Sequence, residues 1–123
     1  MTDVVKFDVQ GHDVQFLCKY RKTRNGFAHD AEMCLDGNRM VDYTCHYYNR
    51  TWELWRYQSV CYGCVRRIIW FREQWLKEEY KKTNNLSRIS GDKHKAALKE
   101  MAENDNRMKL LNAILKELDE RRF

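Results

Sequence analysis

The sequence predicts an α+β fold, in which a four-stranded antiparallel β-meander packs on a long helix and a C-terminal helix completes a helical hairpin. Two observations predict it. Apolar and polar side chains alternate as far as residue 47, as in strands with one buried face. From about residue 52, apolar side chains recur every three or four positions, as in helices. The 123 residues fit one domain, with the meander at 1–50, the long helix at 51–83, a connector at 84–92 and the C-terminal helix at 93–123.

The four strands are expected where alternating segments are separated by turn residues. Turns are predicted at Gly11-His12-Asp13, at Thr23-Arg24-Asn25-Gly26 and at Asp36-Gly37-Asn38, and an Asn-Gly pair supplies positive φ angles readily. The residues expected on the buried face are Val5, Phe7, Val9, Val14, Phe16, Cys18, Tyr20, Phe27, His29, Ala31, Met33, Leu35, Val41, Tyr43, Cys45 and Tyr47.

The long helix is expected to extend beyond the sheet. Its apolar face contains Tyr57, Cys61, Cys64, Ile68, Phe71 and Trp75. A helix of this length spans roughly 45 Å at 1.5 Å per residue, so its far end must bend or pack on something else. The C-terminal helix, whose apolar pattern is interrupted at Asn104, is expected to cover that end. A monomer is favoured, and a dimeric coiled coil through the C-terminal helix is the alternative.

Composition and charge restrict the setting and the partners. The chain has no apolar run near the ~18 residues that span a bilayer, and its first residues lack a charged-then-apolar signal, so a cytoplasmic protein without a membrane partner is expected. The net charge is +5, and residues 61–99 contain ten basic and four acidic side chains. A basic stripe on the long helix attracts nucleic acid or an acidic protein surface, and an ordinary solvated face is the alternative.

The cysteines suggest a metal site or a packed core. Five cysteines without a secretory signal make a disulfide framework improbable. Cys61 and Cys64 form a CxxC pair on the apolar face of the long helix, and Cys18 and Cys45 belong to the facing side of the sheet. These four thiols are the candidate ligands of a zinc ion. The alternative is that they pack as small apolar side chains.

Binding rather than catalysis is the expected activity, because no histidine stands at a motif spacing from a nucleophile and no glycine-rich phosphate loop is present. Aromatic and arginine side chains dominate protein interfaces and also stack on bases. The candidate partner-binding residues lie at the strand-to-helix corner and along the basic helix: Arg50, Trp55, Arg56, Arg66, Arg67, Arg72, Lys77 and Lys81.

The segment from Tyr47 to Glu53, which contains Asn49-Arg50-Thr51-Trp52-Glu53, resembles a motif of small proteins from phages and mobile elements of Gram-positive bacteria. The lead-in Arg24-Asn25-Gly26-Phe27-Ala28-His29 is also similar, and the resemblance covers roughly residues 5–70. The resemblance implies a strand meander followed by a helix, and an origin in a mobile element, so the cytoplasm expected above is that of a bacterial host cell. Among such proteins, we expect an anti-CRISPR inhibitor that binds a type II RNA-guided nuclease and blocks DNA loading or cleavage. A nucleic-acid-binding protein and a structural zinc or dimeric module are the alternatives.

Overall fold

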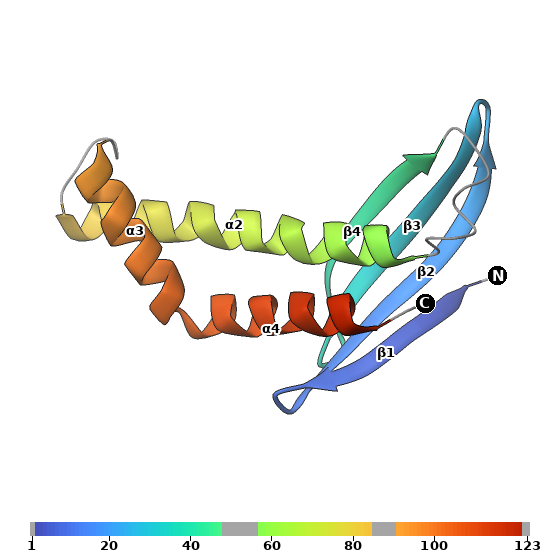
Figure 1. The fold of residues 1–123 in the computed structure, drawn as a ribbon, viewed down its shortest axis with the longest axis horizontal. Helices are drawn as coiled ribbons and strands as arrows, with labels where there is room; N and C mark the ends of the chain where they lie inside the picture. The colour runs from blue at the N-terminus through green and yellow to red at the C-terminus, as the bar shows by residue number, and fades with distance from the viewer. Residues whose placement is uncertain (1, 48–56, 85–90, 122–123) are drawn as a thin grey trace.

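The computed structural model describes residues 2–47, 57–84 and 91–121 and confirms the α+β fold class. A four-stranded sheet precedes three helices, and the long helix pairs with the C-terminal part of the chain (Figure 1). The strands are β1 (Asp3–Val9), β2 (His12–Thr23), β3 (Gly26–Leu35) and β4 (Asn38–Tyr47). The helices are α2 (Gln58–Asn84), α3 (Asp92–Asn104) and α4 (Asn106–Glu120).

The sheet is a meander with the strand order β1-β2-β3-β4, and all three pairings are antiparallel. The tight turns at Gln10-Gly11 and Asp36-Gly37 have positive φ angles at both residues, as a two-residue hairpin turn requires. The turn predicted at Thr23-Arg24-Asn25-Gly26 is confirmed, with Arg24-Asn25 as the loop between β2 and β3, but the expected positive φ angle is wrong, because neither Asn25 nor Gly26 has one. Gly26 is instead the first residue of β3, opposite Thr23.

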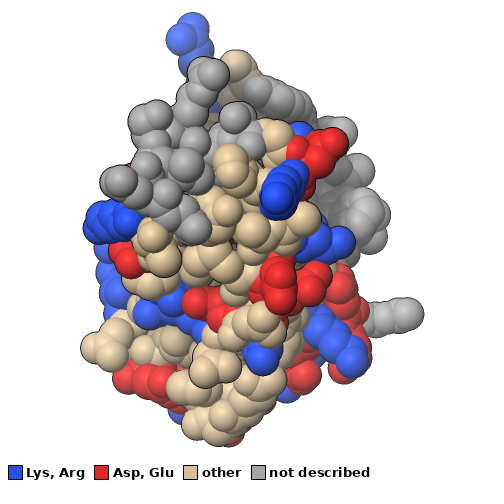
Figure 2. All heavy atoms as spheres, turned by 90° about the vertical axis from the view of Figure 1, so that its left-hand side faces the viewer, with Lys and Arg blue, Asp and Glu red and all other residues tan. Residues whose placement is uncertain are grey.

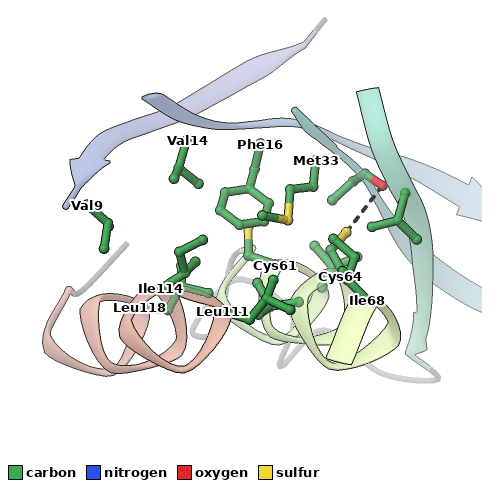
Figure 3. Packing of buried hydrophobic residues seen from close by; sticks show 14 of the residues in the cluster. Val9, Val14, Phe16, Met33, Cys61, Cys64, Ile68, Leu111, Ile114 and Leu118 are labelled. Atoms are coloured by element: carbon green, nitrogen blue, oxygen red, sulfur yellow. Dashed lines mark hydrogen bonds between the residues drawn. The ribbon is translucent and has the colours of Figure 1, made fainter. Parts of the chain in front are cut away.

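The core lies between one face of the sheet and the helices α2 and α4 (Figure 3). The alternation in the strands places Val14, Phe16 and Met33 on this face, each fully buried. The helical residues that cover them are Val60, Cys61, Cys64, Val65, Ile68, Leu110, Leu111, Ile114 and Leu118. This arrangement confirms the two apolar periods for these residues, whereas Tyr20, which was expected on the buried face, is 54% exposed.

The long helix α2 is continuous, and a glycine allows it to approach the sheet. A methyl group at Gly63 would overlap the ring of Tyr43 on β4, so only glycine permits this contact. The start of α2 is held by Tyr57, whose hydroxyl donates to Asp3 Oδ2 at 2.8 Å and whose ring lies 5.0 Å from that of the buried His29, tilted by 56°. Residues 51–56, where the helix was expected to begin, lie outside the described residues.

The C-terminal segment differs from the single helix that was expected at 93–123. Two helices, α3 and α4, meet at Asp105, whose backbone is extended (φ −76°, ψ 121°). The Asp105 carboxylate accepts a hydrogen bond from the backbone N–H of Met108 at 2.8 Å. Asp is a favoured N-cap residue because it satisfies such exposed N–H groups, and a new helix therefore begins at Asn106, directly after this cap.

Helix α2 extends far beyond the sheet. Figure 1 shows α2 and α4 running antiparallel away from it, with α3 crossing at the far end. Five of the six buried residues of α2 lie between Val60 and Ile68, and the sixth is Leu76. The distal half of α2 is therefore largely exposed to solvent. In the described ranges, no helix is long and apolar enough to cross a membrane.

Candidate interaction surface

An exposed aromatic strip begins where α2 leaves the sheet. Cys64, Ile68, Phe71 and Trp75 follow one another at spacings of four, three and four, and they share one side of the helix. Cys64 and Ile68 are buried against the sheet, whereas Phe71 and Trp75 are 53% and 48% exposed. We call Phe71 and Trp75 the aromatic strip. The residues of this apolar pattern are thus buried in the core in the first half of α2 and exposed on the surface in the second half.

Neighbouring contacts order the aromatic side chains. The rings of Trp70 and Phe71 meet edge to face at 5.3 Å between centroids, although Trp70 is 55% exposed. The Arg72 guanidinium lies over the Trp75 ring at 4.1 Å from its centroid. Such contacts restrict rotation before any partner binds, and preorganised aromatic side chains are typical anchors of protein interfaces.

A second strip of α2 is basic. Arg67, Trp70, Gln74, Lys77 and Lys81 follow one another at spacings of three and four, so they share a side of the helix, which Glu73 and Glu78 border. Together with Arg66, these residues form what we call the basic strip. Of the predicted partner-binding residues, Arg66, Arg67, Lys77 and Lys81 therefore lie on one continuous part of the surface.

Few of these cations are neutralised by acids. Lys81 pairs with Glu78 at 3.2 Å. Within the described ranges, Arg66, Arg67 and Lys77 form no ion pair, and all three are exposed. Figure 2, which faces the distal end of the helices, shows Lys and Arg side chains interspersed with Asp and Glu. The positive potential is therefore local to the basic strip.

The aromatic and basic strips meet at a hollow next to the sheet. A volume of about 410 Å³ is bounded by Tyr43 of β4 and by Gly63, Arg66, Arg67, Trp70 and Phe71 of α2. The missing side chain at Gly63 brings the strand close, and the two arginines border the opening. The hollow can accept a side chain from a partner that lies along α2.

Arg72 has a structural position, although the sequence predicted it as a partner-binding residue. Its Nη2 and Nε donate to the two carboxylate oxygens of Asp105 at 2.7 and 3.1 Å. The two side chains are only 24% and 11% exposed. The hydrogen bonds from Arg72 are the main cause that holds the pKa of the Asp105 carboxyl below its usual value. Arg72 thus connects the α3–α4 junction to the Trp75 ring.

The predicted cysteine site is only partly assembled. Cys18 Sγ and Cys61 Sγ lie 3.8 Å apart, both fully buried, whereas Cys64 Sγ donates to the carbonyl oxygen of Ala31 at 3.6 Å (Figure 3). Burial raises the pKa of the Cys64 thiol to about 12, and the contact with Cys18 together with burial raises that of Cys61. Burial also raises the pKa of the half-buried Cys45.

A metal binds cysteines as thiolates, so zinc binding at these thiols would release their protons. Among the residues that the structure describes, no three His, Cys, Asp or Glu side chains are arranged to hold a metal ion. Packing as small apolar side chains accounts for the burial of Cys18, Cys61 and Cys64. The zinc site stays a prediction that metal analysis can check.

The predicted corner residues Arg50, Trp55 and Arg56 lie outside the described residues. Sequence reasoning did not name Trp70, Phe71 and Trp75 as contact residues, because the C-terminal helix was expected to cover this end of α2. The length of the helix could have indicated this exposure, because the 27 residues of α2 extend beyond the face of a sheet whose strands have ten or twelve residues. In the structure, α3 and α4 cover the side of α2 that contains Leu76 and leave the aromatic strip open.

Comparisons with known proteins give no relative: no protein-family model, no curated protein and no solved structure matches this chain.

Proposed function

We propose that this chain is a non-enzymatic binding protein that docks another protein on the distal half of α2. The observation that carries the proposal is the aromatic strip, in which an apolar helix face continues past the sheet and leaves Phe71 and Trp75 about half exposed. Exposed aromatic groups of this size, next to arginines that have no acidic partner, are typical of interface anchors.

The finer proposal is an inhibitor encoded by a phage or mobile element that binds a type II RNA-guided nuclease and blocks DNA loading or cleavage. It rests on the sequence resemblance around Asn49-Arg50-Thr51-Trp52-Glu53. The net charge of +5 argues against imitation of DNA, so binding to a protein surface of the nuclease is the mechanism that this composition supports.

The test is copurification of the tagged chain with a candidate nuclease at about 0.5 M salt, followed by a DNA-cleavage assay. The Phe71→Ser/Trp75→Ser variant should lose the nuclease and the inhibition, because it removes half-exposed aromatic groups that do not belong to the core. Val4→Ser, at a similarly exposed apolar position on β1, is the matched control and should retain both.

Circular dichroism of all three proteins verifies that they are folded. Equal binding by the wild type and the Phe71→Ser/Trp75→Ser variant would reject the aromatic strip as the docking surface. A complex with unimpaired cleavage would retain a binding protein but reject the inhibitor.

Nucleic-acid binding is the second candidate, and the basic strip is the observation that favours it. Phosphate contacts release counterions, so such binding weakens steeply with salt. Binding of a single-stranded oligonucleotide that is lost at about 0.5 M salt, with no protein partner at any salt concentration, would favour this candidate over the protein-binding one.

A further inference from the structure

The aromatic and basic strips lie side by side on α2, and together they define the kind of partner that fits. The basic strip from Arg66 to Lys77 covers about 16 Å along the helix at 1.5 Å per residue. Phe71 and Trp75 occupy a neighbouring part of the helix surface, over about 6 Å within that length. The combined surface therefore runs parallel to the axis of α2.

This shape suits a partner helix. Two helices pack along their axes when side chains at spacings of three and four on one fit between those of the other. Amphipathic helices are bound in this way by grooves and helical surfaces. The hollow beside Gly63 adds a place for one side chain of such a helix near the start of the surface.

The cations of the basic strip indicate which side chains should flank the apolar face of the partner helix. Arg66, Arg67 and Lys77 are exposed cations without an acidic partner in the ranges that the structure describes, and Arg66 also lies 5.6 Å from the Tyr62 ring centroid. Carboxylates on one flank of a partner helix would therefore meet them. Opposite charges placed in this way favour the correct partner and accelerate association.

The acidic residues around the basic strip disfavour nucleic acid as the partner. Glu73 and Glu78 are exposed and flank the basic strip on its two sides, since each is displaced from it around the helix. A nucleic acid carries a charge on every phosphate and would bring some of them close to these carboxylates. A protein helix places a few carboxylates at fixed positions and can avoid both residues.

Trp75 is prepared for this contact. Arg72 lies over its ring and is itself fixed by the two hydrogen bonds to Asp105. An aromatic side chain that is already ordered loses less conformational freedom on binding, so more of the contact energy becomes affinity.

We propose, on the basis of the protein-docking function above, that the partner presents an amphipathic helix to α2. Its apolar residues pack on Phe71 and Trp75, and its Asp or Glu side chains pair with Arg66, Arg67 and Lys77. The recognised chemistry is thus an acidic, amphipathic helical segment of a protein.

A displayed library of amphipathic helices provides the test. Its apolar face is held constant, both flanks are randomised between acidic, basic and neutral residues, and the full-length chain is the bait. Selected helices should be enriched about tenfold or more in Asp and Glu over Lys and Arg on one flank. A labelled oligo(dT) of about 20 nucleotides, measured in the same buffer, is the nucleic-acid probe.

Two variants separate this inference from the docking function on which it rests. Arg66→Gln/Arg67→Gln/Lys77→Gln should still select helices, but without the acidic bias, whereas Phe71→Ser/Trp75→Ser should select none. Selection without acidic bias by the wild type would overturn the inference and leave the docking function standing. Equal selection by the wild type and Phe71→Ser/Trp75→Ser would overturn both, and so would tight binding of oligo(dT) without any selected helix.

Discussion

Gly63 has no Cβ atom, and the ring of Tyr43 occupies the space that a Cβ atom would need. A Cβ atom built at this position overlaps ring atoms of Tyr43 and lies 3.0 Å from its Cγ. The overlap thus extends to the base of the ring, which cannot move without shifting the side chain as a whole. Glycine in mid-helix normally weakens a helix, so its presence here reflects the packing of β4 on α2.

We expect Gly63→Ala to lower the free energy of unfolding by about 1 kcal/mol, because an overpacking cost of roughly 1–3 kcal/mol exceeds the gain of about 1 kcal/mol in helix propensity. Urea unfolding measures the change. In a Tyr43→Ala background, the same substitution should stabilise the protein, since the ring is gone and the propensity gain remains. Stabilisation in both backgrounds would show that the contact does not constrain α2.

The break between α3 and α4 depends on a side chain that serves both helices. Asp105 accepts a hydrogen bond from the Met108 N–H and two from Arg72. The pKa of its carboxyl is lowered, mainly by the hydrogen bonds from Arg72. A lowered pKa in the folded state means that ionised Asp105 stabilises the fold above its unfolded pKa of about 3.9, and this stabilisation is lost as the pH falls through the folded pKa.

Asp105→Asn should therefore lower the free energy of unfolding by about 2 kcal/mol near pH 7, because charged hydrogen bonds to a largely buried arginine are lost. Asn is itself a good N-cap, so the change reports mainly on the pair with Arg72. Urea unfolding between about pH 7 and pH 2 should show the difference from wild type shrinking below about pH 4.

Glu103→Gln, at an exposed position near the end of α3, is the matched control and should change stability little at any pH. A difference between Asp105→Asn and wild type that stays constant over the whole pH range would contradict the role given to the ionised carboxylate.

Local patterns predicted the elements, but not where each of them meets its neighbour. The period of two placed Phe16 and Met33 in the core, and the helical period did the same for Cys61 and Ile68, because both patterns depend only on neighbours in sequence. The exposure of Trp75 depends on where the sheet ends, which no local pattern contains. The interrupted apolar pattern at Asn104 marked the neighbourhood of the break, but it did not predict the break itself, since an Asp such as Asp105 can also face solvent within a continuous helix.

The same limit applies to the cysteines. Sequence reasoning placed Cys18 and Cys61 on facing sides of the core, and their sulfur atoms lie 3.8 Å apart. It could not tell that Cys64 would turn toward the carbonyl of Ala31, because the direction of a side chain depends on the packing around it. The composition of the candidate site was thus partly predictable, but its geometry was not.

Over the whole molecule, stability is expected to fall with distance from the sheet. The sheet, the first half of α2 and α4 share one core, whereas α3 has no buried residue. Hollows of about 240 and 530 Å³ lie on the two sides of α3, and Leu76 of α2 borders both. An element with so little buried apolar surface opens at a lower free energy than the core.

Amide hydrogen exchange should therefore show protection factors in α3 at least about 100-fold lower than those in β2 and β3. The protection factors in α3 should also change little with denaturant concentration. The exchange of α4, which has five buried residues, should resemble that of the sheet and serves as the internal control. Exchange of α3 at the same rate as β2 would show a single cooperative unit.

Because Arg72 connects Asp105 to the Trp75 ring, a helix bound on the aromatic strip should slow exchange at the α3–α4 junction. That slowing should disappear in Asp105→Asn, since a neutral amide at this position can no longer hold Arg72 by a charged pair.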